Sequence, residues 1–234
     1  MMPTVIAMLV ALAVSFAGGE LPEKHFDIKQ APVVRAPTTG VRHAVLLNRR
    51  IPEAGVVVAV KCRYTPQSQG WGSCESLGKL DELNLDSQIA AAELMEGTRL
   101  DLSKLRSLRP VTFVTTTRVR LSPKDFVQLE PPTDPAVYVK DISWAERPSA
   151  EILRDMYPPR AQRHGKGGWV TLTCKVLDDL SPACLPVRVS EPDYGFEQVA
   201  TRMVGLNRVA PTLSDGRSAV GAWFRTAVSF STPE

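Results

Sequence analysis

The chain has 234 residues, which suits one large domain or two small ones. Hydrophobic residues make up 44% of it, enough for real cores, so the composition excludes general disorder. The formal net charge is only +3 and the basic residues are scattered, which argues against nucleic acid as a partner, because nucleic-acid binders usually show a basic stripe with interleaved aromatic residues.

The first residues are typical of an export signal. Residues 3–19 carry no charge, and residues 5–14 are strongly apolar. Ser15 and Ala17 place small side chains at the two positions that a signal peptidase inspects. We therefore predict a signal peptide over residues 1–17, cleavage near Ala17 and export from the cytoplasm. A retained anchor is the alternative, but a span needs about 20 apolar residues, so we expect no stable membrane span.

The cysteines support export, because an even number of cysteines in an exported chain favours disulfides. A zinc site would need closer cysteine pairs or neighbouring histidines, and the histidines lie outside the two cysteine loops. We predict two local disulfides and neither a metal nor a cofactor. The predicted bonds join Cys62 to Cys74 and Cys174 to Cys184.

In chain order, residues 18–40 are polar and proline-containing and suggest a loose lead-in. Residues 41–47 suit a short strand or one turn of helix. A strand over Val56–Tyr64, a helix from Leu85 to Met95 and a half-exposed strand over Val111–Leu121 follow from the spacing of apolar residues. These elements define a first predicted domain, residues 41–129.

Residues 130–147 form the predicted linker, because Glu130–Pro135 holds three prolines in six residues. The second predicted domain, residues 148–234, repeats the order of the first. Cys184 falls out of phase with the valines that follow it, which indicates a bond at the strand entrance or a bulge. Its elements are a short helix over Pro148–Met156, a strand over Gly168–Val176, a returning strand through Val187 and Val189, a helix over Phe196–Val204 and a last strand ending at Phe230.

Several motifs in the second half resemble the TonB C-terminal domain. The resemblance covers residues 148–230, whereas residues 43–121 resemble the family more distantly because they lack the Tyr-Pro motif. The motifs are Tyr157-Pro-Pro-Arg-Ala161, Gly165, Gly168-Trp-Val-Thr-Leu, Val187-x-Val-Ser190, and Phe196 with Ala200, followed by a closing alternating strand.

The resemblance implies an α+β fold of two tandem small domains, each an antiparallel sheet of about three strands with two helices on one face. In that family the domain lies in the periplasm and adds its edge strand to a segment of an outer-membrane receptor. The matching strand here runs from Ala222 to Phe230, and the alternative is that this strand is internal or covered. The predicted partner contacts are Phe224, Arg225, Thr226, Ala227 and Val228, together with Tyr157 and Pro158.

We therefore expect a non-enzymatic interaction module that binds an extended peptide or an envelope protein. One alternative is a membrane-anchored energy transducer, which would keep its anchor and carry a long Pro-rich spacer. The other is a periplasmic enzyme with an unrecognised site. His164 and Asp178-Asp179 are the catalytic candidates, but the sequence has no Gly-x-Ser-x-Gly elbow and no phosphate loop. A deep polar cleft would favour an enzyme, and an open strand edge would favour the module.

Overall fold

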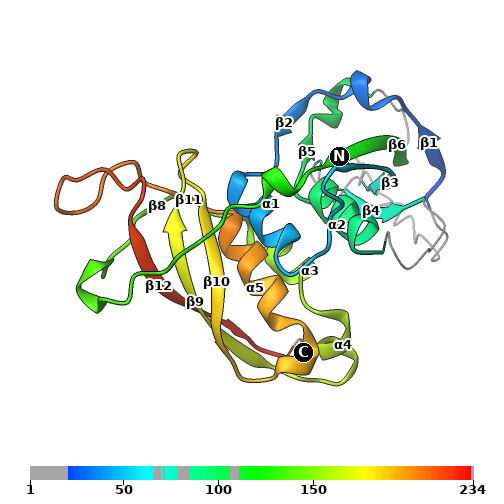
Figure 1. Cartoon of the computed structure of the whole chain (residues 1–234). Helices are drawn as coiled ribbons and strands as arrows, with labels where there is room; N and C mark the ends of the chain where they lie inside the picture. Colours follow the sequence, from blue (N-terminus) through cyan, green and yellow to red (C-terminus); the bar gives the residue numbers. More distant parts are fainter. Residues whose placement is uncertain (1–20, 66–69, 71, 78–84, 106–110, 233–234) are drawn as a thin grey trace, which may run out of the picture.

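The computed structural model describes residues 21–65, 70, 72–77, 85–105 and 111–232. It shows two α+β halves, each built around a four-stranded sheet (Figure 1). Within these residues, no helix has the length and apolar character that crossing a membrane requires. The predicted signal peptide lies outside the described residues.

The first half contains six strands, two α-helices and several short 3-10 turns among its described residues. In chain order they are β1 (Glu23–His25), η1 (Ile28–Gln30), β2 (Val33–Arg35), α1 (Thr39–Leu46), β3 (Val56–Tyr64), β4 (Ser73–Ser76), α2 (Leu85–Glu96), β5 (Arg99–Leu100), η3 (Leu102–Lys104), β6 (Thr112–Leu121) and η4 (Pro123–Asp125).

The second half repeats this order, with the first helix divided into two short ones. Its elements are η5 (Pro135–Val137), β7 (Tyr138–Val139), β8 (Trp144–Glu146), α3 (Ala150–Asp155), α4 (Pro159–Arg163), β9 (Gly168–Val176), β10 (Pro182–Val189), η6 (Pro192–Tyr194), α5 (Phe196–Gly205), β11 (Arg208–Val209) and β12 (Trp223–Phe230).

The two sheets have the same topology. The strand order is β1-β6-β3-β4 in the first and β7-β12-β9-β10 in the second. The last long strand of each half closes its sheet: β6 in the first half and β12 in the second. β1 runs parallel to β6 and β7 runs parallel to β12, whereas the other pairings are antiparallel. The small pairs β2–β5 and β8–β11 repeat as well. The predicted α+β fold with two tandem units is therefore confirmed.

Each sheet has one strand more than the sequence predicted. Residues 18–40, expected as a loose lead-in, include β1 and β2, and residues 130–147, expected as a linker, include β7 and β8. These strands have two or three residues and owe their geometry to distant partners, so no local pattern marks them. The domain limits 41–129 and 148–234 remain predictions, and these strands extend each sheet beyond them.

Period-two alternation builds both cores, as the sequence predicted. Val58, Val60, Cys62 and Tyr64 of β3 are buried, and the matching residues of β9 are buried in the same way. α2 covers the inner face of the first sheet and α5 that of the second (Figure 1). The register of β10 shifts between Pro186 and Arg188, which confirms the bulge alternative for the phase change after Cys184.

α1 joins the two halves, which settles the ambiguity of residues 41–47. It lies against α2 of its own half and against α5 and β10 of the other (Figure 1). Its N-cap residue Thr38 donates a hydrogen bond to the carbonyl of Gly205 at 2.6 Å, so the start of α1 meets the end of α5. A Cβ on Gly40 would lie 2.1 Å from the Pro182 carbonyl oxygen, so only glycine permits this approach.

Ion pairs cross the same junction. The Glu93 carboxylate of α2 lies 2.8 Å from Arg49, which follows α1, and 3.5 Å from Arg202 of α5. Arg202 also lies 3.6 Å from Glu96. These groups are only partly exposed, and a network of paired charges stabilises more than isolated surface pairs do.

Both predicted disulfides are present. Cys62 lies directly opposite Cys74, and Cys174 directly opposite Cys184, with Cα–Cα distances of 4.2 and 4.1 Å. Each bond joins the central strand of its sheet to the strand at one edge. Because each half has a small core, a covalent link between these strands is a large part of its stability.

Reduction should lower the melting temperature of the protein. Closing a loop of this length contributes about 3 kcal/mol in the chain-entropy model. At about 4 °C or more per kcal/mol for a small domain, the expected shift is about 12 °C or more for a half that melts by itself. Thermal unfolding with and without reductant measures the shift, and alanine pairs at Cys62/Cys74 and at Cys174/Cys184 separate the two bonds. An unchanged melting curve in reductant would contradict the prediction.

Candidate functional site

The outer edge of β12 is the candidate site. β12 pairs with β9 along its whole length, from Trp223 opposite Lys175 to Phe230 opposite Gly168. The Val176 amide donates to the Ala222 carbonyl at 2.9 Å, whereas the Trp169 carbonyl accepts from Ser190 on the β10 side at 3.0 Å. Even-numbered residues of β9 therefore bond to β12, and odd-numbered ones bond to β10.

This phase decides the direction of each backbone group of β12. In an antiparallel ladder, residues that bond one neighbour alternate with residues that face the other side. The backbone groups that face away from β9 belong to Trp223, Arg225, Ala227 and Ser229, and those that bond β9 belong to Phe224, Thr226, Val228 and Phe230.

β7 occupies the beginning of this edge. It pairs in parallel with β12, with Tyr138 beside Trp223 and Val139 beside Phe224. The Arg225 guanidinium lies 4.4 Å from the centroid of the Tyr138 ring, and the Tyr138 hydroxyl donates to the Pro132 carbonyl at 3.0 Å. Beyond this contact, the outward backbone groups of Ala227 and Ser229 meet no other strand among the residues that the structure describes.

The opposite edges of both sheets are partly covered. On β10, the Cys184 carbonyl lies 3.2 Å from Nε2 of His43 on α1. Pro182 and Pro186 share the outward phase of Cys184, and proline offers no amide donor there. On β4, the Cys74 amide donates to the Glu96 carboxylate of α2 at 3.4 Å. Side chains from helices, together with the prolines of β10, thus cover part of each of these edges.

The structure brings five of the predicted partner residues together on β12. Arg225 and Ala227 are exposed on the solvent face, whereas Thr226 and Val228 are half-buried on the helix face. Phe224 is only 2% exposed, with its ring centroid 5.9 Å from that of Trp144, so its side chain belongs to the core. A role of these residues in partner binding remains a prediction.

The other two predicted partner residues lie at the far end of the strand. The Tyr157 ring packs edge-on against Phe196 and Phe230, and its hydroxyl donates to the Lys166 carbonyl at 2.5 Å. Pro158 is buried. The Tyr-Pro motif therefore anchors α4 against the core, and any contribution to partner binding would come through the exposed part of Tyr157.

The sequence did not predict β7, the short strand that pairs in parallel with β12. Tyr138 and Val139 follow a Pro-rich segment and form only two ladder pairs, so neither alternation nor length marks them. Trp169 of β9 is 45% exposed directly beside Ser229. Among the residues that pair with β12, Trp169 is the large aromatic one nearest to Ala227 and Ser229.

The catalytic candidates have structural contacts. The Asp179 carboxylate accepts hydrogen bonds from the Thr39 amide at 2.8 Å and from the Ser181 hydroxyl at 2.5 Å. Burial raises its pKa, but these hydrogen bonds outweigh burial and hold the pKa below its ordinary value. His164 is exposed, with Nδ1 3.4 Å from the Tyr194 hydroxyl. Within the described ranges, no cluster of His, Cys, Asp and Glu could hold a metal.

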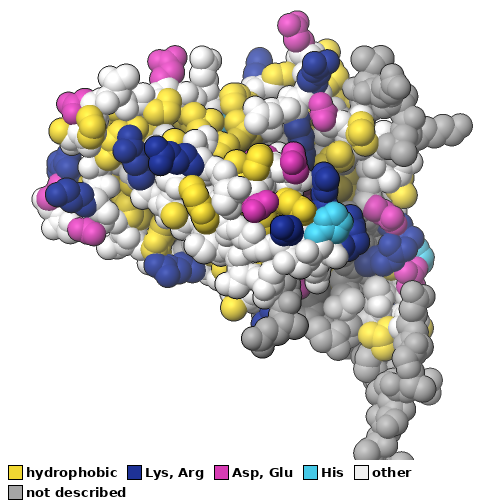
Figure 2. Space-filling model, turned by 90° about the horizontal axis from the view of Figure 1, so that it is seen from below, with side chains coloured by type: hydrophobic (Ala, Val, Ile, Leu, Met, Phe, Trp, Pro, Cys, Tyr) yellow, Lys and Arg dark blue, Asp and Glu magenta, His cyan; other side chains and the backbone are white. Residues whose placement is uncertain are grey.

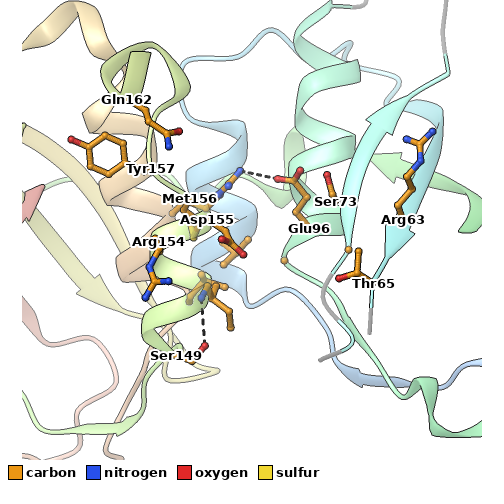
Figure 3. Close-up of a pocket in the computed structure, with 16 residues that line it drawn as sticks. Arg63, Thr65, Ser73, Glu96, Ser149, Arg154, Asp155, Met156, Tyr157 and Gln162 are labelled. Carbon is orange, nitrogen blue, oxygen red and sulfur yellow. Dashed lines mark hydrogen bonds and ion pairs between the residues drawn. The ribbon is translucent and has the colours of Figure 1, made fainter. Parts of the chain in front are cut away.

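A cavity of about 760 Å³ lies between the two halves (Figure 3). α3, Tyr157 and Gln162 of α4 line one side, and β4 with the end of α2 lines the other. Its charged groups are largely paired: Glu96 with Arg202, and Arg63 with Glu23 and Glu75. Burial raises the pKa of Glu96 while Arg202 opposes the rise. The Glu96–Arg202 pair thus joins the two halves beside the cavity, whereas the pairs of Arg63 lie within the first half.

Basic side chains do not form a single patch on the face that Figure 2 shows. On that face, Lys and Arg side chains are scattered among hydrophobic ones. The expectation that nucleic acid is not a partner remains a prediction.

Comparison with known families decides the relationship of the second half. Residues 154–232 match the family described as Gram-negative bacterial TonB protein C-terminal. The second half is thus similar to the TonB C-terminal domain over these residues, and the resemblance inferred from the sequence is confirmed there. The match does not extend to the first half, for which the weaker resemblance remains a prediction. No curated protein and no solved structure matches the chain.

His43 makes the junction between the halves sensitive to pH. Its ring is fully buried and stacks on Phe126 with centroids 4.8 Å apart. Burial lowers its pKa below the ordinary value of about 6.5, although the hydrogen bond to Cys184 opposes the shift. The unfolded chain therefore binds this proton at a higher pH than the folded chain does.

The free energy of unfolding should consequently fall as the pH drops below about 6.5, by up to about 1.4 kcal/mol per pH unit until the folded pKa is reached. Above pH 6.5 both states are neutral at this site and the effect vanishes. Denaturant unfolding of the wild-type protein and of His43→Gln across pH 5 to 8 measures it. The raised pKa of Glu96 increases the free energy of unfolding as the pH falls, which is opposite to the effect of His43. Because Glu96 is present in both proteins, the difference between the two profiles isolates His43. Parallel profiles would refute the prediction.

Proposed function

We propose that the protein is a non-enzymatic interaction module of the periplasm, which binds an extended segment of another envelope protein by adding it to β12. The observation that carries the proposal is the outer edge beyond β7, where the outward backbone groups of Ala227 and Ser229 meet no other strand in the described part of the chain. An exposed edge with these groups is the template that strand addition requires.

The parallel pairing of β7 supports a parallel orientation for the partner. β7 shows that this edge accepts a strand running in the direction of β12. A bound segment would lie beyond Val139 and bond to alternate residues of β12, so main-chain hydrogen bonds would supply affinity. Trp169 and Arg225 are exposed on the solvent face of the sheet and would contact every second side chain of the segment.

The family match by itself supports a TonB-like role in protein interaction. The membrane-anchored transducer and the soluble module would use the same edge, and they differ in whether residues 1–20 are retained, which lie outside the described residues. We favour the soluble module because the apolar run is short for a span. The enzyme alternative has no supporting constellation among the residues described above.

Ala227→Pro tests the edge. The substitution removes an outward amide worth about 1 kcal/mol, and its ring obstructs an approaching strand, so capture of a partner from envelope extract should fall at least about fivefold. Ala227→Ser keeps the amide and serves as the matched control. Thr226→Pro is unsuitable, because the register directs the Thr226 amide into the ladder with β9.

Both variants must first show the melting temperature of the wild-type protein. Quantitative immunoblotting or mass spectrometry of captured proteins then gives the ratio. Equal capture by Ala227→Pro and Ala227→Ser would rule out pairing on this edge.

A further inference from the structure

The closing strand of the first half has the same open edge as β12. The Leu77 amide donates to the Ala59 carbonyl at 2.9 Å, so odd-numbered residues of β3 face β4 and even-numbered ones face β6. Their partners Thr115, Thr117 and Val119 on β6 therefore bond inward. The residues between them, Thr116, Arg118 and Arg120, direct their backbone groups outward.

β1 occupies only the beginning of this edge. It pairs in parallel with Thr112–Val114, and its last contact is the Phe26 amide, which donates to the Val114 carbonyl at 2.9 Å. Thr116, Arg118 and Arg120 are exposed, and no backbone partner meets them among residues 21–65, 70, 72–77, 85–105 and 111–232. The arrangement repeats that of β7 on β12.

The two edges differ in charge. On the solvent face of the first sheet, the register places Lys61 beside Thr116 and Ala59 beside Arg118. Lys61 and Arg118 are therefore diagonal neighbours, about 7–8 Å apart at their backbones. Arg118 and Arg120 follow each other on the same face of β6.

Arg118 and Arg120 form no ion pair with a carboxylate within the described chain. Lys61 forms none either, but it lies directly opposite Glu75 in the β3–β4 ladder. Arg63 on the same face differs, because Glu23 and Glu75 each lie 3.0 Å from its guanidinium.

On β12, by contrast, Arg225 is the one cation at an outward position, and Tyr138 covers it. Lys175 of β9 lies on the same face as Arg225, with its Nζ 5.8 Å from the centroid of the Trp223 ring. The cations beside β12 thus have aromatic neighbours, whereas Arg118 and Arg120 follow each other on β6.

We infer that the outer edge of β6 is a second strand-binding site, which takes an extended protein segment with acidic side chains at alternate positions. The outward backbone groups of Thr116, Arg118 and Arg120 would pair with the segment. Its alternate side chains would point to the solvent face, where Arg118 and Arg120 supply complementary charge. The orientation of β1 sets a parallel direction for the segment. The site is separate from β12, so it stands independently of the function proposed above.

Titration of the exported chain, followed by amide NMR shifts, tests the site. The probe is a short synthetic peptide of alternating glutamate and threonine, and the matched peptide carries lysine in place of glutamate. The acidic peptide should shift the amides of Thr116, Arg118 and Arg120, and the lysine peptide should bind at least about tenfold more weakly at low salt. Arg118→Glu should weaken the acidic peptide by a similar factor. Arg188→Glu, an exposed arginine on β10, should not.

Arg118→Gln keeps the test valid if the charge reversal unfolds the protein, and it should weaken binding less than Arg118→Glu would. Equal affinity for the two peptides, or equal binding by Arg118→Gln and wild type, overturns the inference. Shifts confined to Ala227 and Ser229 would assign the peptide to β12 and also overturn it. If the β6 amides shift with phosphatidylglycerol vesicles but not with the acidic peptide, this face binds a membrane surface and not a peptide strand. That result would also overturn the inference.

Discussion

The direction of the backbone amides along β6 and β12 is the constraint on which the functional reading of this protein depends. In a ladder, a residue that bonds one neighbour turns no group toward the other. The Val176–Ala222 and Leu77–Ala59 hydrogen bonds fix this phase in the two halves. This phase determines which residues face outward. On both β6 and β12, the residues between those that bond the inner strand direct their backbone groups outward.

Side chains and prolines cover part of the other edges of the two sheets. The Glu96 carboxylate covers β4, and His43 together with the outward prolines covers β10. At the start of each closing strand, the chain itself adds a short parallel strand. Unpaired edges invite aggregation, so partial cover limits the exposed backbone to a few alternate residues in each half.

α1 makes the repeat a single structure. It belongs to the first half by sequence but packs on α5 and β10 of the second. Glycines at Gly40 and Gly205 allow the two helices to meet closely, and the network of Glu93, Glu96 and Arg202 adds paired charges on the same side. The corresponding helices of the second half, α3 and α4, do not pack on the first sheet in this way but face the first half across a cavity. The tandem repeat is therefore symmetric in topology and asymmetric at its junction.

The sequence by itself determined the elements whose pattern is local. Alternation located β3, β6, β9 and β12, helical spacing located α2 and α5, and the cysteine spacing identified both disulfides. The Tyr-Pro and glycine motifs indicated the resemblance of the second half to the TonB C-terminal domain. Each of these signals arises because burial on one face of an element imposes a period that neighbouring residues share.

Only the tertiary structure decided which groups meet across the chain. β1 and β7 are too short to show a period, and they exist because distant strands supply their hydrogen bonds. Lys61 is far in sequence from Arg118 and Arg120 and lies beside them only through the β3–β6 register. The pattern of a strand reports which face is buried but not which edge is free, since backbone groups are identical in every residue except proline. Open edges, and the charges beside them, therefore follow from the assembled sheet alone.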